Sequence, residues 1–299
     1  MTDPIELVFC LHQKSLDSPY PMALAAAYIS IRQRTHLQLR LNLIIDSTVQ
    51  DVNLERLNLM LKGSDQLRVL HAASVPEAEQ FAKEIRCLYS PAVIWRAWIP
   101  EYLKDVKRCL MLDSDLIVLM NVYRIWSLDL NGNSLAAVLR RKPHADRYHQ
   151  WVQTSPEKYF RVGICLMDLD QIRLNYDFCE QRISYMQSTA RLNDEIRETN
   201  LLEQSLFNRY FSDSCLPLNL VVPSPDYIRR DIDAQHLKIP DDQAYRSESL
   251  GAIVDLKGWL NRSPECLHFW SALLETPWRE VAVRQFQLLR QPELLQSKL

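Results

Sequence analysis

Two aspartates inside an apolar run are the residues of this sequence best suited to chemistry. Asp113 and Asp115 follow the letters CLML and precede LIVLM, a context that predicts a buried strand. An ionised carboxylate in an apolar interior is costly unless it is paired or bound to a metal ion. Mn²⁺ or Mg²⁺ prefers oxygen ligands and would relieve both charges. The pair therefore indicates a metal site, the alternative being a strand end that turns to solvent.

The spacing of the two aspartates is not specific by itself. The same spacing recurs at Asp168/Asp170 and at Asp231/Asp233, so only the apolar context distinguishes the pair at 113 and 115. A cation held there could also bind a diphosphate and act as a Lewis acid on a departing nucleoside diphosphate.

Glycine is scarce, which restricts how the chain could bind a nucleotide. There are five glycines among 299 residues, about 1.7% against roughly 7% in ordinary proteins. None are spaced as G-x-G-x-x-G or as a P-loop, so a glycine-rich phosphate cradle is excluded. A cation at Asp113 and Asp115 would supply the missing phosphate-binding device.

Charge and cysteine content narrow the class further. The net charge of −2, from 35 basic and 37 acidic residues, argues against a nucleic-acid partner. The seven cysteines are odd in number and form no C-x-x-C, which favours buried reduced thiols over disulfides or structural zinc. The start MTDPIELVFC lacks the basic residues of a signal peptide, and no apolar stretch reaches 18 residues. We expect a cytoplasmic protein.

Strand and helix patterns alternate along the chain and must position these groups. The alternation predicts an α/β fold whose sheet is covered by helices. We expect residues 1–262 to form one domain and residues 263–299 a C-terminal helical extension. The expected strands are 5–11, 38–46, 67–72, 108–120, 134–139, 163–169 and 250–256, and the expected helices are 20–34, 54–63, 92–103, 170–191, 194–211 and the chain from 265 onward.

The segment LMLDSDLIVL resembles the LYLDxDxxV motif of glycosyltransferase family 8, the retaining sugar-nucleotide transferases of GT-A fold. The resemblance covers roughly residues 5 to 270, and four further segments follow family motifs in the same order. These are RAWIPEYL at 96–103, YFRVGICLMDL at 159–169, EQSLFNRYF at 203–211 and AIVDLKG at 252–258.

The resemblance implies a Rossmann-like, mixed and mostly parallel sheet, and an enzyme that moves a hexose from a UDP-sugar to a hydroxyl acceptor. Bacterial lipopolysaccharide galactosyl- and glucosyltransferases are similar. The acceptor would be a glycan, a lipid-linked glycan or a protein, and the cofactor Mn²⁺ or Mg²⁺.

The resemblance also implies roles for particular residues. The metal would be held by Asp113, Asp115 and Asp255, the last of which stands where the family has a histidine. The catalytic residues would be Arg96, Glu203 and Gln204, and the donor-binding residues Cys10, His12, Arg96, Ser114, Arg161, Lys257 and Gly258. The alternatives are an ion pair of Arg96 with Glu101 or Asp105, an exposed helix face for Glu203 and Gln204, and an exposed lysine at 257.

Three positions depart from the family pattern. His12 stands where the family often has Asp, Arg161 where it has Asn, and Arg140 where an acid is common. Arginines beside a sugar site would favour an acidic sugar or acceptor, because guanidinium pairs bidentately with carboxylate. They equally fit a catalytically weakened sugar-nucleotide-binding or scaffold protein.

Two other enzyme classes fit less well. A haloacid-dehalogenase-like phosphatase usually carries its D-x-D on the first strand. A sugar nucleotidyltransferase needs a glycine-rich loop that residues 12–18 lack.

The end of the chain mixes apolar and basic residues over 278–299. This pattern indicates peripheral contact with the inner face of a membrane, the alternative being a helix packed on the domain. Two glycines, Gly163 and Gly258, fall on the family motifs, so their replacement by valine is expected to damage donor binding.

Overall fold

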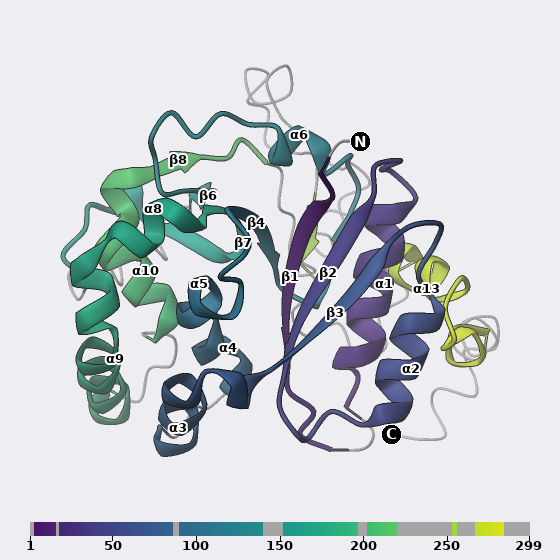
Figure 1. Ribbon diagram of the computed structural model, residues 1–299, viewed down its shortest axis with the longest axis horizontal. Coiled ribbons are helices and arrows are strands. Elements are labelled where there is room, and N and C mark those ends of the chain that lie inside the picture. Colours follow the sequence, from purple (N-terminus) through teal and green to yellow (C-terminus); the bar gives the residue numbers. More distant parts are fainter. Residues whose placement is uncertain are drawn as a thin grey trace, which may run out of the picture.

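The fold centres on a seven-stranded sheet with the strand order β3-β2-β1-β4-β7-β6-β8 (Figure 1). The computed structural model describes residues 3–15, 18–85, 90–139, 152–196, 202–220, 253–255 and 267–283. The strands of the sheet are β1 (Ile5–Leu11), β2 (Leu39–Ile45), β3 (Gln66–His71), β4 (Arg108–Leu112), β6 (Leu135–Leu139), β7 (Phe160–Asp168) and β8 (Cys215–Pro217).

Only β7 runs against the other strands of this sheet. β1 pairs in parallel with β2 and β4, and β2 with β3, whereas β7 is antiparallel to both β4 and β6. β8 is parallel to β6. The expectation of a mixed, mostly parallel sheet is confirmed.

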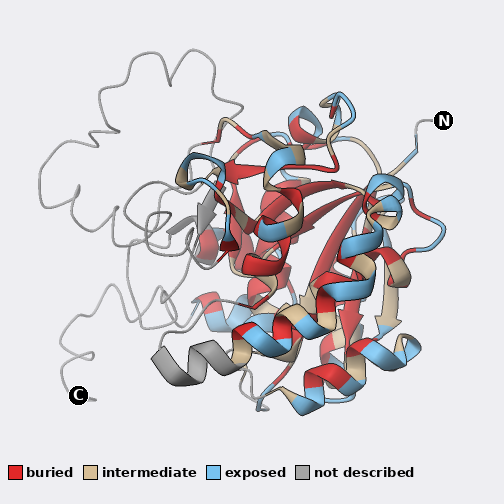
Figure 2. Cartoon of the chain, turned by 90° about the vertical axis from the view of Figure 1, so that its left-hand side faces the viewer, coloured by how far each residue is buried: buried red, intermediate tan, exposed pale blue. Residues whose placement is uncertain are grey.

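The central strands are apolar because both of their faces are covered. In β1, Leu7 and Phe9 belong to one buried cluster, while Val8 belongs to the other. Strands buried on both sides read as continuous apolar runs rather than as alternating ones. In Figure 2 the central strands are accordingly red, and exposed residues lie on the outer sides of helices and in loops.

Helices form a layer on each face of the sheet (Figure 1). On one face lie α1 (Tyr20–Arg32), α2 (Asp51–Leu59) and α13 (Leu267–Leu273). On the other face lie α3 (Pro76–Glu84), α4 (Pro91–Trp95), α5 (Ile99–Tyr102), α8 (Leu169–Leu174), α9 (Tyr176–Ile196) and α10 (Glu203–Phe211). The remaining short helices are α6 (Tyr123–Trp126), η1 (Ala72–Ser74), η2 (Arg96–Trp98), η3 (Pro156–Lys158) and η4 (Ser212–Ser214).

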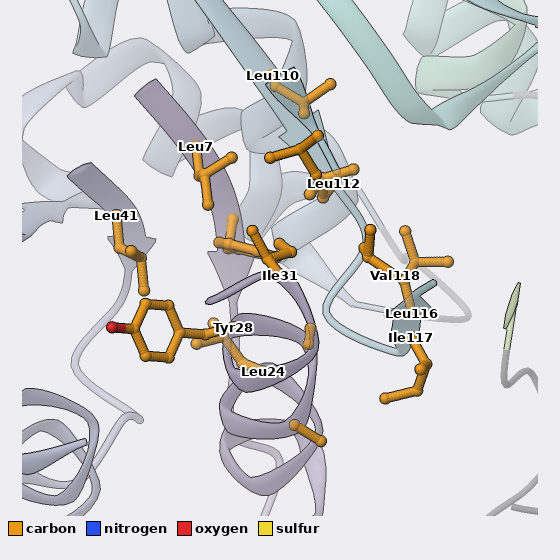
Figure 3. Close-up of a cluster of buried hydrophobic side chains, with 14 of the residues drawn as sticks. Leu7, Leu24, Tyr28, Ile31, Leu41, Leu110, Leu112, Leu116, Ile117 and Val118 are labelled. Atoms are coloured by element: carbon orange, nitrogen blue, oxygen red, sulfur yellow. The ribbon is translucent and has the colours of Figure 1, made fainter. Parts of the chain in front are cut away.

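The cluster under α1 shows how the first layer is joined to the sheet (Figure 3). Leu24, Tyr28 and Ile31 of α1 are at most 1% exposed and belong to the same cluster as Leu7 and Leu110 of the sheet. Burying a large apolar side chain contributes about 1.5–3 kcal/mol. This packing therefore stabilises the position of α1 against the sheet.

The expected single strand over 108–120 is wrong. It divides into β4 and β5 (Leu116–Val118), and β5 belongs to a second sheet with β9 (Ile253–Asp255). The break falls at the three polar residues 113–115, which leave the apolar sheet rather than being buried in it.

The expected helix over 92–103 is also interrupted. It consists of α4, η2 and α5, with Pro100 in the first turn of α5. Proline lacks the N–H that a continuous helix would need at that position.

The expected helix over 170–191 likewise divides into α8 and α9 at Asn175, whose side chain accepts a hydrogen bond from Phe178 N–H. Of the expected helix over 194–211, residues 194–196 belong to α9 and 203–211 form α10.

The described part of the C-terminal region packs into the protein. Phe269 and Leu273 of α13 are completely buried in the cluster that contains α1, as is Ala282 further along the chain. The division at residue 262 stays a prediction, and the basic residues beyond 283 lie outside the described part. Within the described ranges, no helix has the length and apolar character needed to cross a bilayer.

Candidate active site

The candidate site lies where β1 and β4 end beside each other. The chain passes from β1 to β2 on one side and later returns to β4 on the other, so these neighbours mark the topological switch point of the sheet. Ligands of open α/β sheets bind at this place, outside the carboxyl ends of the strands. Asp113, Ser114 and Asp115 follow β4 directly and are all partly buried.

Arg96 bridges two carboxylates that come from distant parts of the chain. Its Nη2 lies 2.5 Å from Asp113 Oδ1, and its Nη1 lies 3.2 Å from Glu203 Oε1. The three side chains are only 13–15% exposed. The structure therefore brings Arg96, Glu203 and Asp113 together, and their roles in a site stay predictions. Glu101 and Asp105, the alternative partners, pair instead with Arg182 and Arg68.

The charges around Arg96 shift the pKa values of its neighbourhood. Burial alone would lower the pKa of Arg96, but Asp113 and Glu203 outweigh this effect and raise it. Burial raises the pKa of Cys10, at the end of β1, to about 12, with Arg96 opposing the shift. Arg96 is therefore a permanent cation, and Cys10 is a neutral thiol beside it.

Gly163 of β7 makes room for Asp113. The Asp113 N–H donates to Gly163 O at 2.9 Å, and a Cβ added at Gly163 would lie 2.1 Å from Asp113 Oδ2. The pairing of β6 with β7 is irregular at Ala137 and Val138, opposite this stretch. Bulges of this kind are frequent beside active sites, where they redirect side chains. Gly163 thus has a steric reason to be glycine.

Helix α10 brings Glu203 and Gln204 to the site from its first turn. Gln204 Nε2 donates to the hydroxyl of Tyr159 at 3.2 Å, and Tyr159 itself is fully buried. Both residues of α10 are partly buried, so the alternative of an exposed helix face is not supported.

His12 follows β1 and is held by the residue that follows β2. Its Nδ1 lies 2.8 Å from Asp46 Oδ2 and 3.2 Å from Thr48 Oγ1. Thr48 in turn donates from its hydroxyl and its N–H to Asp46 Oδ1. The side chains of His12 and Asp46 are about equally buried, at 15% and 14% exposed. The residues that follow β1 and β2 are thus joined by a His–Asp pair.

The remaining expected site residues are placed less completely. Arg161 lies on β7, partly buried and two positions from Gly163. Arg140, Lys257 and Gly258 lie outside the described residues. The roles assigned to all of these residues stay predictions.

The carboxylates suit a hard divalent cation. The pairing of β5 with β9 sets Asp255 opposite Leu116, the residue after Asp115, although the Asp255 side chain is outside the described set. Among the side chains that are described, no three His, Cys, Asp or Glu groups gather as a metal cluster. Asp113, Asp115 and Asp255 would form an all-oxygen donor set, which fits Mn²⁺ or Mg²⁺.

Sequence reasoning missed two residues of this region. Burial raises the pKa of Tyr20, at the start of α1, and the negative charges of Asp115 and Asp113 raise it further. Tyr20 is 40% exposed. Asp46 was the other omission. Each was marked by its place directly beyond an apolar strand or at the first turn of the following helix.

Comparison with known proteins gives a consistent result. The family model described as glycosyl transferase family 8 matches residues 14–221, more than two thirds of the chain. General stress protein A of Bacillus subtilis (strain 168) is 33% identical over 84 residues. That alignment covers 27% of this chain and only 29% of the relative.

Solved structures with the same fold cover nearly all of the chain. The galactosyltransferase LgtC, solved in complex with donor and acceptor sugar analogs, has a TM-score of 0.68 at 18% identity, covering 91% of this chain and 96% of its own. The bifunctional WbbM in its apo form has a TM-score of 0.66 at 16% identity, covering 95% and 52%. Mouse xyloside xylosyltransferase 1 has a TM-score of 0.59 at 12% identity, covering 86% and 99%. At these identities the likeness shows the GT-A fold.

Proposed function

Since this chain belongs to glycosyl transferase family 8, we propose that it transfers a hexosyl group from a UDP-sugar to a hydroxyl acceptor with retention of configuration. The observation that carries the proposal is the Asp113–Arg96–Glu203 bridge at the switch point of the sheet. Family motifs separated by more than 100 residues contribute to this single contact network, as a shared site requires.

Asp113, Asp115 and Asp255 would bind Mn²⁺ or Mg²⁺, which supplies Lewis-acid stabilisation to a departing nucleoside diphosphate. Arg96 would orient the donor, because its guanidinium offers several donors in one plane to phosphate or sugar oxygens. Ser114, His12 and Cys10 would line the donor side of the site. Lys257 and Gly258 would approach the phosphates from the late part of the chain.

Glu203 and Gln204 would act at the sugar. Glu203 contacts Nη1 of Arg96 while Asp113 contacts Nη2, so the two carboxylates together fix the direction of the guanidinium. Gln204, oriented by Tyr159, would lie beside the anomeric carbon. Neither group has to form a covalent bond, because the acceptor hydroxyl would attack from the face of the leaving group and the departing phosphate would accept its proton.

The experiment is donor hydrolysis with Mn²⁺ across a panel of UDP-sugars, comparing wild type with Asp113→Asn. The chain provides its own matched control, since Asp168 and Asp170 share the spacing. Asp170 is 52% exposed and pairs with Arg173 outside the site. Asp113→Asn is expected to abolish hydrolysis while Asp170→Asn leaves it unchanged. Equal turnover by wild type and Asp113→Asn would refute the assigned role.

A weakened sugar-nucleotide-binding protein is the second candidate. The observation that favours it is the arginine at position 161, where the family has an amide, on the same strand as Gly163. Calorimetry with UDP and Mn²⁺ separates the two functions. Binding without turnover of any UDP-sugar would support the binding protein, whereas transfer to an acceptor would exclude it.

The remaining partners follow from the same proposal. The acceptor would be a glycan, a lipid-linked glycan or a protein, and a lipid-linked acceptor would bring the protein to the inner membrane face. Incubation with each acceptor class and one UDP-sugar, followed by mass measurement of the products, identifies which of them gains a hexose.

A further inference from the structure

Asn208 is a fully buried amide that joins α10 to β7. Its Oδ1 accepts a hydrogen bond from the backbone N–H of Phe160 at 2.8 Å. Its Nδ2 donates to the carbonyl of Phe160 at 2.9 Å and to the carbonyl of Gln204 at 2.8 Å. An amide used in this way has one orientation only, because exchanging its oxygen and nitrogen would break all three bonds.

The two elements joined by Asn208 both supply the candidate site. Glu203 and Gln204 form the first turn of α10, about one turn before Asn208. Three residues after Phe160, β7 carries Gly163, which accepts the Asp113 N–H and leaves space for its carboxylate. The amide of Asn208 therefore joins the helix that carries Glu203 to the strand that accommodates Asp113.

The apolar packing of α10 cannot set this position alone. Phe207 and Phe211 pack against Phe178 of α9 at ring-centroid distances of 5.5 and 4.9 Å. Such contacts are favourable over a range of helix positions, whereas hydrogen bonds weaken steeply with distance and angle. The contact between Arg96 and Glu203 is already 3.2 Å, so a small displacement of α10 would break it.

We propose that Asn208 is a positioning residue: it fixes the first turn of α10 against β7 and thereby holds Glu203 and Gln204 in register with Arg96 and Asp113. The inference rests on the proposed glycosyl transfer for its kinetic consequence. Its structural part, the placement of Glu203, does not depend on that function.

The test compares Asn208→Ala with Asn42→Ala. Asn42 is also a completely buried amide, in β2, and it donates to Glu6 and to the carbonyl of Leu7 far from the carboxyl end of the strands. Both variants lose a buried hydrogen-bonded amide, so both are expected to melt at a lower temperature. If the cavity in Asn208→Ala prevents folding, Asn208→Leu retains the volume and removes only the hydrogen bonds.

The readouts are a crystal structure of each variant and the kcat and KM of donor hydrolysis with Mn²⁺. We expect the Arg96–Glu203 contact to be lost only in the Asn208 variant. We also expect kcat to fall there by about 10- to 100-fold, since misplacement by about an ångström costs this much. The donor KM is expected to change by less than about threefold, because Asp113 stays in place.

Retention of the Arg96–Glu203 contact in the Asn208 variant, or a fall in kcat no larger than in Asn42→Ala, would overturn the proposal. Absence of turnover in the wild type would instead contradict the proposed function. In that case the crystallographic contact alone decides whether Asn208 positions α10.

Discussion

At the scale of single residues, Arg96 holds two carboxylates at once in a region that is about 85% shielded from solvent. Its two terminal nitrogens reach Asp113 and Glu203 separately, and both contacts are charge-assisted. A lysine has one compact ammonium group and cannot span the same pair. The residue type, and not only its charge, is therefore required by the geometry.

Replacing Arg96 with lysine tests this requirement. We expect Arg96→Lys to lower kcat/KM for donor hydrolysis by at least about tenfold, because one carboxylate loses a charge-assisted hydrogen bond. Arg68→Lys is the control, since Arg68 pairs with Asp105 at the protein surface. Equal kcat/KM for the two variants would show that the bridge is not needed.

Gly163 provides a second prediction. A methyl group at this position would overlap Asp113 Oδ2, so we expect Gly163→Ala to displace the carboxylate and weaken Mn²⁺-dependent UDP binding about tenfold or more. Gly63→Ala is the control, because nothing lies within 4 Å of its added Cβ.

The φ of Gly63 is +61°, so the control variant should lose stability, by about 1 kcal/mol, without losing UDP affinity. Calorimetry and thermal melting measure the two effects. The same loss of UDP affinity in both variants would mean that Gly163 has no particular relation to the site.

The buried thiol of Cys10 makes the stability of the folded protein depend on pH in the alkaline range. Its thiol has a pKa of about 12 in the folded protein, against about 8.5 for an unfolded thiol. At a pH between these two pKa values the thiol is ionised in the unfolded state and neutral in the folded state. The contribution of Cys10 to the free energy of unfolding is therefore fully present below about pH 8.5 and is lost as the pH rises.

The comparison is thermal melting of wild type and Cys10→Ser between pH 7.5 and 10. We expect the melting temperature to fall less steeply with pH in the variant, because one of the thiols that oppose folding at high pH is gone. Other buried thiols, such as Cys109, retain part of the dependence. Identical slopes would contradict a raised pKa at Cys10.

At the scale of elements, the segment that carries Arg96 is short and broken, and arginines of the next layer hold it. Arg173 of α8 donates to the carbonyls of Pro100, Leu103 and Val106 at the end of α5. Arg182 of α9 donates to the carbonyl of Ala97, next to Arg96, and lies over Trp98 with its Cζ 4.6 Å from the ring centroid. The short helices of this segment contain few hydrogen bonds of their own, so hydrogen bonds from arginines of α8 and α9 hold the segment in place.

Removal of one of these donors is expected to loosen the segment. Arg173→Met should lower the free energy of unfolding by about 1–3 kcal/mol, because three backbone carbonyls lose the hydrogen bonds that the charged guanidinium donates to them. Arg68→Met should change it by less than about 1 kcal/mol, as is usual for surface ion pairs. Urea denaturation of both variants checks the difference, and similar values would refute the supporting role of Arg173.

The limits of sequence reasoning are visible in the same segment. The apolar pattern over 92–103 predicts helix correctly as a type, but Pro100 and the tertiary donors decide where it breaks. The run over 109–120 is apolar except for the three polar residues 113–115, and its periodicity does not show that β5 belongs to a second sheet. Asp113 and Asp115 were identified by context, whereas Tyr20 and Asp46 are marked in the sequence only by their place at the start of a helix and beyond a strand.

At the scale of the whole molecule, the site depends on a core to which the last described helix contributes. Phe269 and Leu273 of α13 are fully buried in the cluster beneath α1, the helix that begins with Tyr20. Both the N-terminal and the C-terminal parts of the chain therefore support the layer next to β1 and β4. The order of motifs predicted the fold, but it did not indicate that α13 packs into the core beneath α1.

Phe269→Ala is expected to lower the free energy of unfolding by about 3–5 kcal/mol, because it leaves a cavity in this cluster. Val281→Ala is the control, as Val281 is 44% exposed and should cost far less. Chemical denaturation followed by tryptophan fluorescence measures both. A small effect at Phe269 would mean that α13 is dispensable to the core.

The geometry of the site depends on the register in which the antiparallel strand β7 pairs with β4. In the native register Leu112 pairs with Ile164, which sets Gly163 beside Asp113. A slip by one residue would bring Val162 or Ile164 to the place of Gly163 and fill the space of the carboxylate with a branched side chain. A chain that folds with this error cannot keep a working site, so a competent site requires the native pairing of β4 with β7.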